Sequence, residues 1–392
     1  MAADPTNSGS ITQAGFAALK RGDSAAARAL FERSISTGAA EAAAWFGLSQ
    51  AHRLQGASDE ESSSLDQALK LDAHYLPALL AKADWFARFG DRRAASSYYR
   101  AFIKLAATLP SVPAHMRADL ARAQAVSQRF AREFEDHLLS SLAANGLGSS
   151  ASKRFGHAIE LLLGRKQIYL QEPKYFFFPE LPHIQFFDPR AFDWVAELEA
   201  ESGAIRAELT ALLAAGDGFI PYLQAEQSRP AFDTKKLLGN PDWSAYFLIK
   251  EGVAMAKHMA QCPRTVAALR RAPLCRIERR TPSVLFSLLR PGTRIPPHHG
   301  FMNTRLICHL PLVMPRGCGL RVGNEARQWR EGELIVFDDT IEHEAWNSSN
   351  EARIVLIFDI WRPELSEEER RLVSAMLAAI DGFDGNPQKW TD

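Results

Sequence analysis

The sequence has little cysteine, no long apolar run and no net charge. Its 392 residues include four cysteines without a CxxC pair, which are too few and too scattered for a disulfide framework or a zinc knuckle. No stretch approaches the ~18 apolar residues that a membrane-spanning helix requires, so no such helix is expected. Because 46 basic residues balance 46 acidic ones, the composition offers no broad electrostatic surface for nucleic acid.

The remaining composition is that of an ordinary soluble protein. Apolar residues make up 46% and charged residues 23% of the chain, and a prior of one domain per ~150 residues predicts two or three domains. The N-terminal segment MAADPTNSGS lacks the apolar stretch of a signal peptide. The simplest expectation is a cytoplasmic protein whose cysteines are small buried apolar residues.

An internal repeat occupies the first part of the chain, which is rich in alanine. Glycines recur at intervals of 34 residues, the period of tetratricopeptide helix pairs, and a large residue follows each glycine by nine positions. The three pairs are Gly22 with Phe31, Gly56 with Leu65, and Gly90 with Tyr99. We expect helix pairs that either present a concave surface to a protein or peptide or serve only as a helical cap or dimer contact.

The texture of the sequence changes after the Gly/Ser-rich segment Asn145–Ser150, a candidate domain boundary. From Ser283 onward, short apolar or β-branched runs lie between turn residues, at 284–290, 304–313, 319–322, 334–338 and 353–361. This spacing predicts an antiparallel jelly roll, or double-stranded β-helix, whose open mouth can hold a metal and a small acid.

The expected fold class is therefore α+β. We predict a tetratricopeptide-like helical repeat domain over residues 1–150. A jelly-roll domain with flanking helices is predicted over residues 151–392, with its core at about 175–365.

Two histidines of the strand-rich part lie in segments that suit a metal site. His298 follows two prolines in a loop, and His343 lies just past a strand end. Imidazoles that a closed sheet brings together can bind a divalent first-row metal. The usual oxygen-activating site adds a carboxylate two residues after the first histidine, but here that position is Gly300. Asp338 and Asp339 either supply a ligand or, as strand-terminal aspartates more often do, cap a turn or orient a histidine.

An ordered series of short motifs runs from about residue 175 to about residue 365. In chain order they are Phe178-Pro, Trp243–Gly252, Cys262-Pro-x-Thr265, Pro297-His-x-Gly300, Asn303-x-Arg305-Leu-x-x-His309-Leu, Gly317-Cys318, Val322-Gly, Trp329-x-x-Gly332, Phe337-Asp-Asp-x-x-x-His343-Glu-x-Trp346, Arg353 and Asp359-x-Trp-x-Pro363-Glu-Leu. The series resembles the aspartyl/asparaginyl β-hydroxylase family over nearly half the chain. In that family a glycine replaces the carboxylate ligand, so Gly300 is similar to the family pattern.

The resemblance implies iron(II), 2-oxoglutarate and dioxygen as requirements, with His298 and His343 holding the iron. Ser287 and Arg353 match family positions that bind the distal carboxylate of 2-oxoglutarate, and His309 matches a position that contacts its other end. Elementary chemistry agrees on the arginine: it begins an apolar strand where an unpaired charge is costly, and a guanidinium offers two parallel donors to one carboxylate.

One position departs from the pattern. Animal members have an arginine two residues before the histidine that His309 matches, where this chain has Ile307. Arg305 lies on the same face of the strand by alternation and is expected to contact cosubstrate or substrate; the alternative is a surface salt bridge.

The resemblance implies hydroxylation of an unactivated carbon, the β-carbon of an Asp- or Asn-type residue in a peptide or of a free amino acid. The repeats are a possible site for a protein partner. Related bacterial enzymes also hydroxylate a lipid acyl chain, which leaves that substrate open. The rival hypotheses are a repeat-based interaction module with a catalytically silent barrel, and a cupin-like isomerase or hydrolase that uses another metal.

Overall fold

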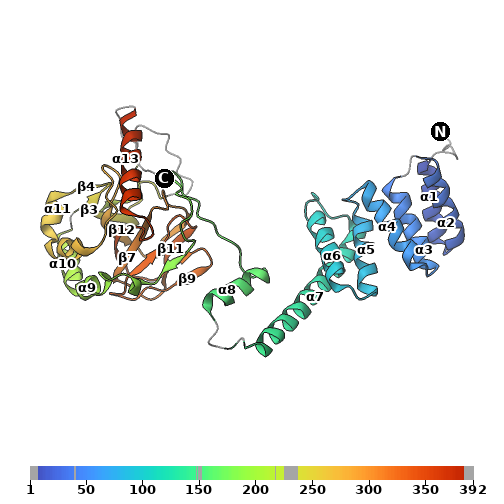
Figure 1. Cartoon of the computed structure of the whole chain (residues 1–392), viewed down its shortest axis with the longest axis horizontal. Helices are drawn as coiled ribbons and strands as arrows, with labels where there is room; N and C mark the ends of the chain where they lie inside the picture. The colour runs from blue at the N-terminus through green and yellow to red at the C-terminus, as the bar shows by residue number, and fades with distance from the viewer. Residues whose placement is uncertain are drawn as a thin grey trace. The chain divides into compact units, whose positions relative to one another are not determined.

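The computed structural model describes residues 8–38, 41–146, 148, 152–216, 218–224 and 237–383. The chain forms two compact units, residues 1–156 and residues 157–392, and each is described by itself. Residues 149–151, which include the end of the predicted boundary segment, lie outside the described residues. Figure 1 shows helices throughout the first unit and strands gathered in the second.

The first unit consists of three helix pairs followed by one longer helix. Its helices are α1 (Ser8–Lys20), α2 (Ser24–Ser36), α3 (Ala42–Leu54), α4 (Ser58–Leu71), α5 (Leu76–Arg88), α6 (Arg92–Ala106) and α7 (Arg117–Ala144). The repeat glycines Gly22, Gly56 and Gly90 lie between the two helices of successive pairs, with φ angles of 80°, 73° and 86°. These angles disfavour any residue with a Cβ, so the 34-residue spacing reflects one turn used three times. The helical-repeat prediction is confirmed.

Local chemistry sets where the second helix of each pair begins. The Asp23 side chain accepts a hydrogen bond from the N–H of Ala26, and Asp91 accepts one from Ala94, which satisfies backbone donors that a helix start leaves open. Nine residues after its glycine, Phe31 is fully buried. A Cβ added at Gly47 on α3 would overlap its ring, so small residues let these helices approach closely.

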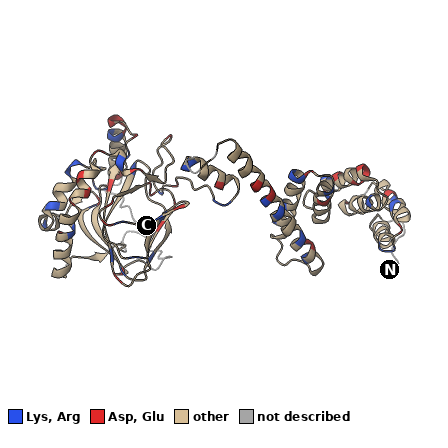
Figure 2. Ribbon diagram, turned by 90° about the horizontal axis from the view of Figure 1, so that it is seen from below, with Lys and Arg blue, Asp and Glu red and all other residues tan. Residues whose placement is uncertain are grey.

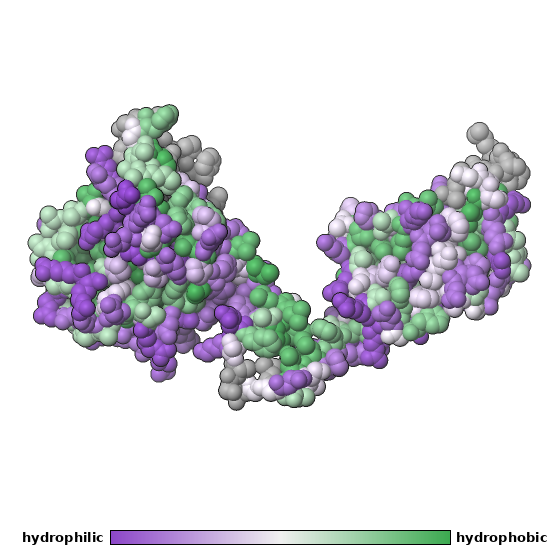
Figure 3. Space-filling view, in the orientation of Figure 1, coloured by the Kyte–Doolittle hydropathy of each residue, from purple (hydrophilic) through white to green (hydrophobic). Residues whose placement is uncertain are grey.

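Charges of both signs are spread along the helices of this unit (Figure 2). Across the described ranges, no helix is both long and apolar enough to cross a membrane. Helix α8 (Lys153–Leu162), at the junction of the units, carries exposed apolar surface (Figure 3), to which Phe155 and Leu162 contribute.

The second unit is a jelly roll built from two antiparallel sheets. Its strands are β1 (Phe186–Phe187), β2 (Ile220–Pro221), β3 (Trp243–Lys250), β4 (Val253–Ala254), β5 (Val284–Leu289), β6 (Arg294–His298), β7 (Arg305–Val313), β8 (Cys318–Val322), β9 (Glu325–Arg327), β10 (Ile335–Phe337), β11 (His343–Asn347) and β12 (Arg353–Trp361). The larger sheet has the order β1-β10-β7-β12-β5-β3-β2, with β4 paired to β3, and the smaller has the order β6-β11-β8-β9. The α+β prediction is confirmed.

Helices cover the outer face of the larger sheet. They are α9 (Val195–Ala200), α10 (Ser202–Ala215), α11 (Ala256–Gln261) and α12 (Pro263–Ala268), and α13 (Glu367–Phe383) packs through Val373 and Leu377 beside the barrel (Figure 1). The apolar core under the first four helices includes Phe286, Leu310 and Phe358. A second apolar cluster fills the space between the two sheets and includes Leu289, Leu320 and Val322. This interior also contains the predicted site.

Candidate active site

His298 and His343 form a cross-strand pair in the smaller sheet. They are direct partners in the β6–β11 register, and their ring centroids lie 4.0 Å apart. The sequence placed both residues in loops, whereas the structure places them at the last position of β6 and the first of β11. Backbone pairing of the two strands therefore brings the two imidazoles together. This pairing fixes their relative position more narrowly than two loops would.

Backbone contacts set the tautomer of both rings. The Nδ1 atom of His298 lies 2.8 Å from the carbonyl oxygen of Pro296, and that of His343 lies 3.1 Å from the carbonyl oxygen of Ile341. A carbonyl oxygen only accepts, so each Nδ1 carries the proton and each Nε2 keeps its lone pair. Burial, and then the neighbouring His298, lower the pKa of His343 well below its ordinary value. The donor set therefore fits a divalent metal.

The carboxylate of Asp339 occupies the space into which a side chain at position 300 would extend. A Cβ added at Gly300 would overlap the Cγ, Oδ1 and Oδ2 atoms of Asp339, and the Gly300 N–H donates to the Asp339 carbonyl oxygen over 2.6 Å. Considering the described residues alone, Oδ1 of Asp339 is buried without a hydrogen-bond partner. Over the same residues, no group of three or more His, Cys, Asp or Glu side chains could hold a metal. The histidine pair thus stands beside a carboxylate rather than in a three-ligand cluster with it.

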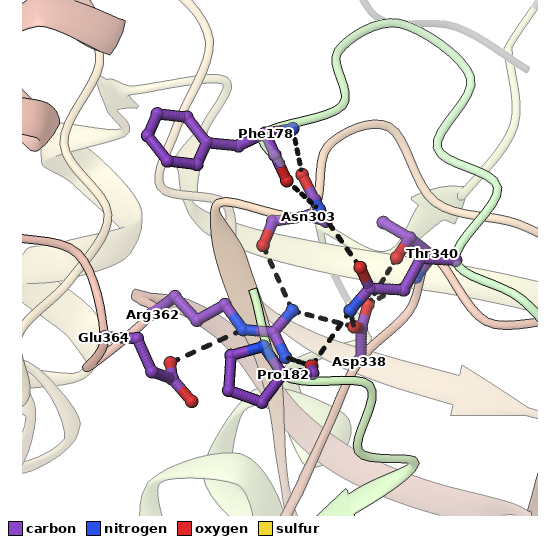
Figure 4. A network of polar contacts seen from close by, with 8 residues as sticks. Phe178, Pro182, Asn303, Asp338, Thr340, Arg362 and Glu364 are labelled. Atoms are coloured by element: carbon purple, nitrogen blue, oxygen red, sulfur yellow. Dashed lines mark hydrogen bonds and ion pairs between the residues drawn. The ribbon is translucent and has the colours of Figure 1, made fainter. Parts of the chain in front are cut away.

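Asp338 has a different task. Its carboxylate accepts from the buried Arg362 over 2.8 Å and from Gln171 over 2.7 Å. Arg362 also donates to the carbonyl oxygens of Asn303 and Pro182, while the Asn303 side chain exchanges two hydrogen bonds with the backbone of Phe178. Figure 4 shows how this network fastens the segment 171–182, which we call the strap, to the barrel. Of the two roles considered for Asp338, the contacts favour the structural one.

The larger sheet supplies the other half of the site. Ser287 on β5 pairs with Val355, and His309 on β7 pairs with Ile357. Arg353 precedes these two partners on β12 by two and four positions, so alternation puts Ser287, His309 and Arg353 on the inner face. Ser287 Oγ lies 3.2 Å from the indole nitrogen of Trp243. Since an indole N–H only donates, the serine accepts there and keeps its own proton to donate.

A chain of ring contacts joins the two halves. The Phe337 ring lies 5.5 Å from His343 and 5.0 Å from His309. His309 in turn lies 5.9 Å from Trp329, whose ring is 4.3 Å from the guanidinium carbon of Arg353. The histidine pair and the arginine therefore face one interior.

Arg353 is a buried cation, and no described residue is seen to form an ion pair with it. It is 1% exposed, and within the described part of the chain its Nε and Nη1 atoms have no hydrogen-bond partner. Burial lowers its pKa to about 10, and burial followed by the charge of Arg353 lowers the pKa of His309 well below its usual value. A buried donor that has no hydrogen-bond partner lowers the stability of the fold by about 1–3 kcal/mol, and by more when the donor is charged. An anionic ligand would remove that cost.

Arg305 already has carboxylate partners. Its guanidinium lies 3.0 Å from Asp339 and 3.2 Å from Asp359, and the side chain is buried. It is therefore an interior ion pair and not the surface salt bridge considered as an alternative. The contact with cosubstrate stays a prediction, while the position of Arg305 shows that it holds the Asp339 carboxylate next to Gly300.

Two tryptophans near Arg353 and Ser287 were not among the predicted site residues. Trp243 and Trp329 appear in the motif series, but strand alternation cannot show that their side chains meet Ser287 and Arg353. A buried indole beside a predicted polar residue is the signal that sequence reasoning had available, since a buried indole N–H usually finds a partner.

Fold and site together define a jelly-roll protein with a cross-strand histidine pair and a buried arginine in one interior. Residues 199–363 match the family described as Aspartyl/Asparaginyl beta-hydroxylase, and the resemblance noted from the motifs is confirmed. Over these residues the C-terminal unit of this chain is similar to that family.

Three relatives show the range of similarity. The chain is 33% identical over 189 residues to the ornithine lipid ester-linked acyl 2-hydroxylase of Rhizobium tropici, covering 47% of this chain and 63% of that protein. It is 38% identical over 136 residues to human aspartyl/asparaginyl beta-hydroxylase (34% and 18%) and 31% identical over 215 residues to human aspartate beta-hydroxylase domain-containing protein 2 (53% and 56%). The chain thus spans less than two thirds of the length of each.

Solved structures give only a distant likeness. The secretion chaperone SycD of Yersinia enterocolitica is 15% identical, with 32% of this chain and 83% of that chain covered and a TM-score of 0.29. The Sgt2 TPR domain of Aspergillus fumigatus is 18% identical, with 37% and 87% covered and a TM-score of 0.28. The helical-repeat description therefore stands on the helix pairs and their glycine turns.

Proposed function

We propose that the C-terminal unit is an iron(II)- and 2-oxoglutarate-dependent hydroxylase. The observation that carries this proposal is the buried guanidinium of Arg353, which faces the same interior as the His298–His343 pair. A metal site alone is compatible with many reactions, but an interior cation next to it calls for an acid that binds close to the metal. A short dicarboxylate such as 2-oxoglutarate meets that need.

Each residue has a task in this proposal. His298 and His343 would hold the metal through Nε2. Iron, when bound there with 2-oxoglutarate, would supply the activation of dioxygen that hydroxylation requires. Arg353 and Ser287 would bind the distal carboxylate through charge-assisted hydrogen bonds, and His309 would contact the other end. The apolar filling between the sheets excludes water from the reacting centre.

Asp339 would support a metal that has two protein ligands. Its carboxylate lies where a side chain from Gly300 would extend, and Arg305 holds it there. Polar groups beside the ligands commonly orient a metal-bound water or a coordinating histidine, and we assign Asp339 this positioning role.

The family favours a substrate of the Asp or Asn type, either in a peptide or as a free amino acid. A lipid acyl chain is a second candidate substrate, and exposed apolar side chains near the site support it. Ile168 and Leu170 are 74% and 58% exposed, and they precede the point where the backbone N–H of Glu172 donates to the carbonyl oxygen of Thr340, beside the site. Apolar side chains at that position would suit an apolar substrate. The first unit would offer its helix pairs to a protein partner.

The proposal is tested by spectroscopy and a product screen. Under anaerobic conditions, iron(II) plus 2-oxoglutarate should give a weak visible charge-transfer band, which His298→Ala should abolish. Succinate release is then measured with free amino acids, Asp- and Asn-containing peptides, and lipids. Succinate with one class identifies the substrate. No band and no succinate with any class would leave the silent-barrel hypothesis, in which only the repeats function.

A matched variant separates acid binding from folding. Arg353→Met keeps the side-chain volume but removes the buried charge, so the apoprotein should be as stable as the wild type or about 1–3 kcal/mol more stable. Metal binding should be retained, whereas the affinity for 2-oxoglutarate should fall at least ~100-fold, because a charged hydrogen bond is worth about 1.5–3 kcal/mol and more than one is lost. An unchanged affinity would contradict the assignment.

A further inference from the structure

Trp329 contacts both polar residues at the acid-binding end of the interior. It lies between β9 and β10 and is 5% exposed. Its ring lies 4.3 Å from the guanidinium carbon of Arg353 and 5.9 Å from the ring of His309. An aromatic face at this distance from a guanidinium attracts it and limits the orientations it can take.

Unsatisfied polar atoms concentrate at these three residues. Nε1 of Trp329, Nε and Nη1 of Arg353 and Nδ1 of His309 are all buried, and none finds a hydrogen-bond partner in the described part of the chain. Buried polar atoms are normally paired, so four unpartnered atoms on these three neighbouring side chains point to a ligand that brings acceptors. An indole N–H can only donate, so the atom facing Trp329 must be an acceptor such as a carboxylate oxygen.

We propose that Trp329 is a binding residue for the distal carboxylate of the dicarboxylate cosubstrate. Its indole N–H donates to that carboxylate, while its ring keeps the guanidinium of Arg353 oriented toward the same group. This inference rests on the proposed function and extends it: Trp329 joins Arg353 and Ser287 in distinguishing a dicarboxylate from a monocarboxylate. Ile307 has an apolar side chain and supplies no such donor.

The test uses two substitutions and two ligands. Trp329→Phe keeps an aromatic face and removes the N–H, and Trp329→Leu removes both. The full-length protein is loaded with Zn(II), so that no turnover occurs, and binding is measured by calorimetry. The ligands are 2-oxoglutarate and 2-oxopentanoate, which has a methyl group in place of the distal carboxylate. Trp346→Phe is the control, because Trp346 packs on Gly319 and alternation places it on the opposite face of β11 from His343.

The expected result is a selective loss. Trp329→Phe should weaken 2-oxoglutarate about 10-fold, the value of one hydrogen bond to a charged group, and Trp329→Leu should weaken it further. Binding of 2-oxopentanoate should stay within about twofold in every variant, and Trp346→Phe should match the wild type. Equal weakening of both ligands would show a merely structural role and overturn the inference. A wild-type protein that does not bind 2-oxoglutarate would instead refute the proposed function.

A second measurement uses the wild-type protein, so its result does not depend on whether a substituted protein folds. In wild-type protein labelled with ¹⁵N-tryptophan and loaded with Zn(II), one indole N–H proton signal should move downfield when 2-oxoglutarate is added, because that proton acquires a charged acceptor. The signal should not move with 2-oxopentanoate. If no indole proton responds to 2-oxoglutarate that calorimetry shows to be bound, the N–H does not contact the ligand.

Discussion

Gly300→Ala tests whether the Asp339 carboxylate occupies the space of the missing ligand. The new methyl group would overlap that carboxylate, so either the interior is overpacked, at about 1–3 kcal/mol, or Asp339 leaves Arg305 and breaks a buried pair, at about 3–5 kcal/mol. We expect a loss of about 3 kcal/mol. For a unit of 236 residues, from 157 to 392, this lowers Tm by about 6–12 °C.

A double-mutant cycle gives the sharper measurement. Asp339→Ala alone should cost about 3 kcal/mol, because it removes one of the two carboxylates that face Arg305. In the double variant the methyl group introduced by Gly300→Ala enters the vacated space, so the combined loss should stay near about 3 kcal/mol instead of the additive ~6. Calorimetry of the full chain measures each Tm. The reasoning is wrong if Gly300→Ala has the Tm of the wild type. It is also wrong if the losses of the two single variants add up in the double variant. Gly300→Asp should meet the same overlap and build no three-ligand site.

Two further predictions concern the strap and the thiols. Arg362→Met should destabilise the second unit by about 3–5 kcal/mol, because it leaves the buried Asp338 without its cation, and should speed proteolysis within the strap. The 89%-exposed Arg190 is the control, since Arg190→Met should change neither. Burial raises the pKa of all four cysteine thiols, that of Cys262 to about 12. Thiolates are therefore scarce at pH 8, and a disulfide reagent should modify the native protein far more slowly than the urea-unfolded chain; rapid labelling of native protein would contradict the burial.

Three long buried strands of the larger sheet could be predicted from the sequence, and an edge strand of the smaller sheet could not. The apolar runs at 284–290, 304–313 and 353–361 correspond to β5, β7 and β12, which lie side by side in the larger sheet. β6 was missed because it contains Pro296 and Pro297, and it tolerates them as an edge strand whose outer N–H groups need no partner. A hydrophobic pattern in the sequence indicates which residues are buried, and β6 has only one buried residue.

Motif order was enough to predict the site residues, whereas their polar partners could not be predicted. Asp339 and Asp359 lie 34 and 54 positions from Arg305 in the sequence, and only the fold brings these carboxylates to it. Likewise, the sequence around Trp329 does not indicate that the loop between β9 and β10 places this side chain over Arg353. Long-range pairing decides which charge is satisfied and which is left for a ligand.

The histidine pair that we propose binds the metal and the residues that we propose bind the acid belong to different sheets. β6 and β11 carry His298 and His343, while β5, β7 and β12 carry the residues for the acid. Under that proposal, the thickness of the apolar layer between the sheets sets the distance between the metal and the distal carboxylate of the acid. We therefore expect substitutions of apolar residues in this layer, such as Leu289 or Val322, to change the rate of the proposed reaction although they leave every proposed site residue unchanged.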